Sequence, residues 1–231
     1  MDLTELYERL ALGELSNLAL AETGTVSDEK RPSVVLYINE GLHRLYNRFH
    51  LKQDYLLLEL SGHRTRYLLD SRHALSNTDP SNTRIRYIND IGRPFTDDIV
   101  KVLKVDDVYG ISIPLNKPGD PASLFTPRPD VLEVPYPQAG MPVAVTYQAQ
   151  HPKLSVERPN QELELPEFLV GALSSYVAHK VFTHMNTQES TVKAAEHLAV
   201  FEAICVEAKE QDLITTGEAT SSIRFDENGW V

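Results

Sequence analysis

Residues 165–190 read LPEFLVGALSSYVAHKVFTHMNTQES, and this stretch indicates the class of fold that the chain adopts. Apolar side chains recur from Leu169 to Val181 at spacings of three and four residues, which is the period of one helix face. Asn186 and Glu189 then have the spacing of a capping box at the start of a second helix. Because only a very short turn separates the two patterns, we predict a pair of antiparallel helices.

The amino end of the chain carries a second helical pattern. Asp2 and Glu5 have capping-box spacing, and a short helix is predicted to end near Gly13. Pro32 opens a longer pattern of apolar residues, which predicts a helix over about residues 33–50. Between the two helices, GELSNLALAETGTVSDEK has the composition of an ordered loop whose leucines still bury.

The middle of the chain differs from both flanks in its proline content. Of the 14 prolines, 12 lie between Pro80 and Pro159. Proline breaks helix interiors, so we predict short strands and loops here. YLLLEL and TRYLLD, separated by a turn-like SGHR, predict a β-hairpin. Further predicted strands are 84–88, 99–105, 109–114, 131–134 and 143–148, and 116–130 is predicted as a long exposed loop.

Composition excludes several classes of protein. The 231 residues include 22 Lys+Arg and 33 Asp+Glu, which gives a formal charge of −11. This excess disfavours a protein that wraps nucleic acid with its whole surface, although a local basic patch remains compatible with it. Cys205 is the only cysteine, so an intramolecular disulfide and a zinc site of paired thiolates are excluded within one subunit. The start MDLTELYERL lacks the pattern of a signal peptide, and no apolar run is long enough for a membrane helix, so we expect neither export nor a membrane anchor.

Signatures of catalysis are weak. No glycine-rich phosphate loop and no nucleophile elbow occurs. Ser190 and Lys193 match a four-residue nucleophile spacing that arises readily by chance, and His179 and His184 are five residues apart, unlike metal ligands at four-residue spacing. Cys205 is predicted to pack as a small apolar residue. We therefore predict no enzyme, no cofactor and no metal.

Basic residues gather in two places. Arg44, Arg48 and Lys52, with two interspersed histidines, form a stripe that either contacts nucleic acid or complements a helix end electrostatically. The central region contains five further arginines, which either meet an acidic partner or pair with acidic residues across strands. These five are Arg64, Arg66, Arg72, Arg84 and Arg86.

The carboxyl end combines polar and apolar residues. Ile223, Phe225 and Trp230, the only tryptophan, lie in an otherwise polar stretch. An arm that inserts these side chains into a neighbouring subunit would bury a large apolar area. Folding back over the chain's own core would bury the same side chains, so both alternatives stand.

Several of these segments together resemble the head-to-tail adaptor proteins of short-tailed double-stranded DNA bacteriophages, also called tail tubular or gatekeeper proteins. The segments that carry the resemblance are GELSNLAL, PSVVLYINEGLHRLYNRF, LPEFLVGALSSYVAHKVFTHMNTQES and the ending RFDENGWV. The resemblance implies an α+β fold in which residues 1–51 and 161–213 form an antiparallel helical bundle. Residues 52–160 would form a β-rich, sandwich or barrel-like insertion, and residues 214–231 an extended C-terminal arm.

The resemblance also implies a function. The protein would be a structural component of the virion, assembled in the bacterial cytoplasm, that forms a dodecameric ring at the head–tail interface. The ring would contact the portal protein on one side and tail nozzle or tail fibre proteins on the other, and the genome would pass through its lumen without sequence-specific binding. Residues implied in partner contact are Ile223, Arg224, Phe225, Trp230 and Val231.

A second hypothesis assigns the protein a catalytic role. It would be a glycan-active or other hydrolytic tail component in which carboxylates of the β region act as acid and base. The candidates are Asp97, Asp98, Asp106 and Asp107. Such chemistry requires two carboxyl groups about 5 to 10 Å apart in a cleft.

Overall fold

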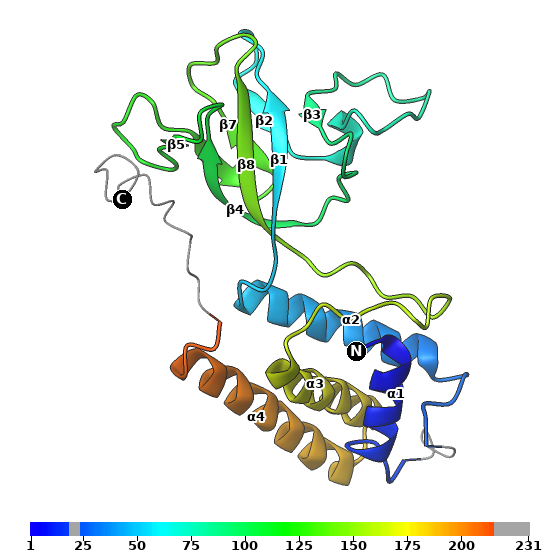
Figure 1. Ribbon diagram of the computed structural model, residues 1–231. Helices are drawn as coiled ribbons and strands as arrows, with labels where there is room; N and C mark the ends of the chain where they lie inside the picture. Colours follow the sequence, from blue (N-terminus) through cyan, green and yellow to red (C-terminus); the bar gives the residue numbers. More distant parts are fainter. Residues whose placement is uncertain (19–23, 215–231) are drawn as a thin grey trace, which may run out of the picture. The chain divides into compact units, whose positions relative to one another are not determined.

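A computed structural model describes residues 1–18 and 24–214 and has the predicted α+β class, with N-terminal helices, central antiparallel sheets and a C-terminal helix pair (Figure 1). The helices are α1 (Leu3–Leu12), α2 (Arg31–Arg48), α3 (Glu167–Met185) and α4 (Gln188–Glu210), with a short 3-10 helix, η2 (Ser71–His73). The strands are β1 (Gln53–Glu59), β2 (Arg66–Leu68), β3 (Ile88–Asn89), β4 (Ile99–Asp106), β5 (Ser112–Ile113), β6 (Phe125–Arg128), β7 (Val131–Glu133) and β8 (Pro142–Ala149).

The chain divides into two compact units. Met1–Gly41 and the described residues from Leu154 onward form the first, here called the helical unit. Leu42–Lys153 form the second, called the sheet unit, which contains every strand in the described part of the chain.

The helical unit joins the two flanks of the sequence. Asp2 and Glu5 form the predicted capping box of α1, which confirms that helix start. The backbone N–H of Leu3 donates to the carbonyl of Gln161, 3.2 Å away, so the beginning of the chain contacts the segment that leads into α3. Of the leucines predicted to bury in the loop after α1, Leu15 is fully buried, Leu18 is half-buried, and Leu20 lies outside the described residues.

α3 and α4 lie side by side and antiparallel, as predicted (Figure 1). Tyr176 contacts Phe201 with ring centroids 5.4 Å apart, and Phe182, six residues further along α3, stacks on His197. The predicted capping box at Asn186 is wrong by one residue. Asn186 has a left-handed backbone and ends α3, and Thr187 caps α4 instead. Asparagine adopts this conformation more readily than most residues, which explains the shift.

The sheet unit contains two antiparallel sheets. Their strand orders are β3-β1-β8-β4-β5 and β2-β7-β6. The predicted β1–β2 hairpin is therefore wrong, because β1 pairs with β8 and β3 while β2 pairs with β7. The turn after β1 leads the chain from one sheet to the other, and both strands thereby place apolar side chains in one core.

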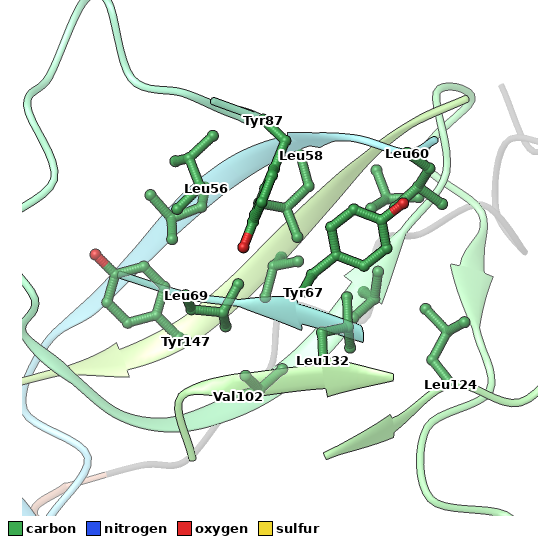
Figure 2. Packing of buried hydrophobic residues seen from close by; sticks show 14 of the residues in the cluster. Leu56, Leu58, Leu60, Tyr67, Leu69, Tyr87, Val102, Leu124, Leu132 and Tyr147 are labelled. Carbon is green, nitrogen blue, oxygen red and sulfur yellow. The ribbon is translucent and has the colours of Figure 1, made fainter. Parts of the chain in front are cut away.

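The core of the sheet unit consists of buried side chains from both sheets (Figure 2). Leu56 and Leu58 of β1 alternate with exposed neighbours, as expected for a strand with one buried face. Tyr67 of β2 and Leu132 of β7 belong to the same buried cluster. The rings of Tyr67 and Tyr87 meet edge to face, with centroids 5.1 Å apart.

The predicted loop 116–130 is more ordered than its proline content suggested. It contains β6, and Asn116 exchanges hydrogen bonds with Thr126. Leu124 is buried. β6 lies at the edge of its sheet, where Pro127 needs no N–H for a neighbouring strand, so proline is tolerated there.

Two predicted strands are much shorter in the structure. From 84–88 only Ile88 pairs within a strand, as part of β3, and from 109–114 only the residues of β5 do. Both are edge strands of the five-stranded sheet, and short edges limit pairing with other chains. As a result, Arg84 and Arg86 lie on an irregular, exposed segment.

Candidate functional site

Two adjoining hollows on the sheet unit bring together arginines from distant parts of the sequence. One hollow, of about 470 Å³, is lined by Arg86 and Ile85, and the other, of about 330 Å³, by Arg66 and Arg128. Arg64 and Tyr87 line both. We call this surface the arginine groove and define it by Arg64, Arg66, Ile85, Arg86, Tyr87 and Arg128.

Tyr87, which lines both hollows of the groove, is held in place by hydrogen bonds and ring contacts. Its hydroxyl donates to the carbonyl of Leu68, at 2.8 Å, and accepts from the N–H of the same residue, at 2.9 Å. The His73 ring stacks on Tyr87 with centroids 4.6 Å apart, and the Arg64 guanidinium carbon lies 4.8 Å from the ring centroid. Burial raises the pKa of Tyr87, so its phenol stays neutral and the arginines determine the charge.

The four arginines differ in their partners. Arg66 forms a cross-strand ion pair with Glu133 at 2.7 Å, and Arg128 pairs with Asp130. Within residues 1–18 and 24–214, neither Arg64 nor Arg86 forms an ion pair. Cross-strand pairing therefore explains Arg66 but not Arg64 or Arg86.

Arg64 is half-buried and Arg86 is exposed. Glu59 is the only carboxylate among the described residues that line the two hollows. The groove therefore presents more positive than negative charge, and guanidinium groups bind carboxylate or phosphate through paired N–H donors.

The remaining arginines of the central region lie elsewhere. Arg72 pairs with Asp70 at 2.5 Å, which lowers the pKa of that carboxyl to about 2, and Arg84 is exposed. Sequence reasoning missed Arg128 and Tyr87, because 116–130 was predicted as a loop and an isolated tyrosine carries no local signal.

A third hollow of the sheet unit, of about 190 Å³, collects acidic and aromatic groups. Asp98 accepts a hydrogen bond from the Tyr147 hydroxyl at 3.0 Å, and burial raises the pKa of Asp98. Burial and the nearby Asp98 also raise the pKa of Tyr147. Asp54 lines the same hollow and accepts from Arg93 at 2.8 Å.

The four predicted aspartates do not form one site. Asp97 and Asp98 precede β4, while Asp106 and Asp107 lie at its far end, roughly 25 Å away for a strand of this length. Asp97 accepts from the backbone N–H and the hydroxyl of Ser71, and Asp107 accepts from two backbone N–H groups of its own turn. Of the four, only Asp98 lines a described hollow.

The other predicted positions have structural contacts. Ser190 is buried in the capping box of α4, and Cys205 is fully buried, as predicted. The His179 ring lies 2.8 Å from the carbonyl of Ala194 through Nδ1, while His184 lies near the end of α3. In the described ranges, no group of three or more His, Cys, Asp or Glu side chains is placed to hold a metal ion.

Two further predictions concern the first basic stripe and the carboxyl end. His43 and Asn47 are hydrogen-bonded at 2.9 Å, and Arg48 lies 5.9 Å from the ring centroid of Phe49.

Among helices in the described residues, none has the length and apolar character needed to cross a bilayer. The predicted partner-contact residues Ile223, Arg224, Phe225, Trp230 and Val231 lie outside the described residues.

No protein-family model matches the chain, and no curated protein matches it either.

Proposed function

We propose that this protein is a head-to-tail adaptor of a bacteriophage virion. Twelve copies would form a ring that binds the portal protein on one side and tail nozzle or tail fibre proteins on the other. In its finer form, the proposal holds that the helices make an antiparallel bundle, the sheets a sandwich or barrel-like insertion, and residues 214–231 an extended arm.

The observation that supports the proposal is the contact between helices from the two ends of the chain. Arg9 of α1 pairs with Glu167 of α3 at 3.0 Å, and Glu40 of α2 pairs with Lys180 of α3 at 2.7 Å. The sheet unit is inserted in the sequence between these helices. This is the chain order that the family resemblance implies.

The acidity of the chain is compatible with a conduit for DNA. Each copy has a formal charge of −11, and a ring of twelve would carry twelve times this charge. Acidic groups facing the lumen would keep DNA from adhering as it passes. A strongly electropositive lumen in the assembled ring would contradict this part of the proposal.

Assembly with the portal tests the proposal directly. The purified full-length protein is mixed with its portal and examined by electron microscopy, where we expect a ring of this protein on the portal. A portal that stays bare at saturating concentration would refute the adaptor function.

Truncation tests the contribution of the carboxyl end. Removal of residues 222–231 should leave the helical signal in circular dichroism unchanged and weaken assembly on the portal. If the truncated chain assembles equally well, the arm does not form the contact.

The hydrolytic alternative is supported by one observation, the hollow that contains both Asp98 and Asp54. Burial raises the pKa of Asp98, while Asp54 is ion-paired with Arg93. When two carboxyl groups have different environments, one can stay protonated and act as the acid while the other stays ionised and acts as the base. Incubation with host cell-wall and capsular polysaccharides, followed by analysis of reducing ends, tests it. Activity that is lost in Asp98→Asn would favour hydrolysis, and no release of sugar would reject it.

A further inference from the structure

We propose that the arginine groove of one copy binds the exposed face of α4 in a second copy of this chain. This inference rests on the proposed function in one respect: the proposed ring is the assembly in which the contact would be repeated between neighbouring copies. The partner is identified by the distribution of charge and by the chemistry of the two surfaces.

Charge is divided unequally between the two units. Residues 42–153 contain 14 Lys+Arg and 12 Asp+Glu, a net charge of +2. The rest of the chain contains 8 Lys+Arg and 21 Asp+Glu, a net charge of −13. The opposite signs favour a contact between the sheet unit of one copy and the helical unit of another over a contact between two helical units.

α4 presents a stripe suited to a basic, partly apolar groove. Six exposed residues recur along it at alternating spacings of four and three, which places them on one face of the helix. This α4 stripe consists of Val192, Glu196, Ala199, Ala203, Val206 and Glu210. Val192 is 57% exposed and Val206 is 44% exposed, so the stripe presents apolar as well as acidic side chains.

The groove carries the complementary groups. Arg64 and Arg86 have no carboxylate partner within the described residues, and a glutamate can accept two N–H bonds from one guanidinium. Ile85, which is 66% exposed, lines the groove beside Arg86 and can cover a valine of the stripe. The two alanines of the stripe allow the backbone of α4 to approach closely.

A protein surface fits the groove better than a nucleic acid does. Two of the four arginines are already neutralised by Glu133 and Asp130, and the whole sheet unit carries only two excess positive charges. Affinity for nucleic acid comes mainly from many unpaired cations along the phosphate backbone. Two guanidinium groups that have no carboxylate partner in the described part of the chain, beside an exposed isoleucine, match a short acidic and apolar surface instead.

The contact would be heterologous, because the groove and the α4 stripe belong to different units. Each copy would offer its groove to one neighbour and its α4 stripe to another. Repetition of such a contact gives a closed ring when the rotation between copies closes, and an open filament otherwise. The same surface pair thus provides a physical route to a cyclic assembly.

Sedimentation velocity of the full chain tests the contact. At about 20 mM NaCl we expect association that increases with protein concentration, and at about 500 mM NaCl we expect its loss, because salt screens exposed charges. Arg64→Glu with Arg86→Glu should weaken association at low salt about tenfold or more. Lys101→Glu with Lys117→Glu changes the net charge equally at exposed positions outside the groove and should leave association unchanged.

Charge exchange makes the test specific. Glu196→Arg with Glu210→Arg, at two exposed positions of α4, should by itself cause the same loss of association as Arg64→Glu with Arg86→Glu, here called the groove variant. The test therefore does not depend on whether the groove variant, which changes the half-buried Arg64, folds. A chain that carries both pairs of changes should associate again, because opposite charges face each other once more.

Two outcomes would overturn the proposal. One is a monomer at every concentration at low salt, and the other is association that the groove variant and its control reduce equally. Binding of a fluorescent DNA duplex that requires Arg64 and Arg86, without self-association, would make nucleic acid the occupant and would also overturn it.

The portal assay separates this interface from the adaptor function. A groove variant that still forms rings on the portal would refute the interface and leave the function standing. A wild-type chain that associates through the groove, yet leaves the portal bare, would refute the function and leave the interface standing.

Discussion

Gly41 allows α2 and α3 to approach more closely than any residue with a side chain would. A Cβ atom placed on Gly41 would lie 2.6 Å from Cδ1 of Leu173 and 2.9 Å from Cδ1 of Tyr176. Carbon atoms in good contact are about 3.5–4.0 Å apart. Leu173 is fully buried and Tyr176 is only 3% exposed, so a shift of either side chain has to displace the protein atoms packed around it.

Gly41→Ala is therefore expected to destabilise the protein. Alanine gains about 1 kcal/mol over glycine in a helix interior, while overpacking of a close contact costs about 1–3 kcal/mol. The net change is a decrease of about 0–2 kcal/mol in the free energy of unfolding. Urea denaturation followed by far-ultraviolet circular dichroism measures it.

Gly171→Ala is the matched control in the neighbouring helix. Its new Cβ would lie 3.6 Å from Cδ1 of Ile204, an ordinary contact distance. The helix preference then acts alone, and the free energy of unfolding should rise by about 1 kcal/mol. If Gly41→Ala stabilised the protein as much as Gly171→Ala does, the close approach of α2 and α3 at Gly41 would be refuted.

Three further substitutions test the capping, core and electrostatic arguments. Thr187→Ala should lower the free energy of unfolding by about 1 kcal/mol, because it removes the side chain that caps α4, and thermal denaturation followed by circular dichroism measures the loss. Leu58→Ala, which empties a fully buried site, should cost about 2–5 kcal/mol in urea denaturation, whereas Leu57→Ala on the exposed face of β1 should cost far less. The raised pKa of Asp98 means that the folded state binds this proton more tightly, so stability declines as pH rises from the ordinary carboxyl pKa of 3.8 through the raised value. Asp98→Asn keeps an acceptor for Tyr147 and should remove this decline, and parallel declines in both proteins across that pH range would contradict the assignment.

The helical flanks could be predicted because their signals are local. Apolar side chains at three- and four-residue spacing indicated α3 and α4, and Asp2 with Glu5 indicated the start of α1. Where a helix prediction failed, as at Asn186, the error was one residue, because capping depends on the backbone conformation of single residues.

The sheet unit could be predicted only in part. The strand character of β4 and β8 was evident from β-branched residues, and that of β1 from the short apolar run YLLLEL, but their partners were not. A turn-like sequence between β1 and β2 suggested a hairpin, and the structure instead assigns them to different sheets. Strand pairing joins segments distant in sequence, so local composition does not specify it.

By itself, the sequence determined an acidic chain with a single cysteine, helical flanks and a proline-rich β region. Only the tertiary structure decided which arginines share a surface. Arg64 and Arg66 follow β1, Arg86 precedes β3, and Arg128 ends β6, so three separate segments must fold together before the groove exists. The physical reason is that helix formation depends on neighbours three and four residues away, whereas a groove depends on how two sheets pair and pack.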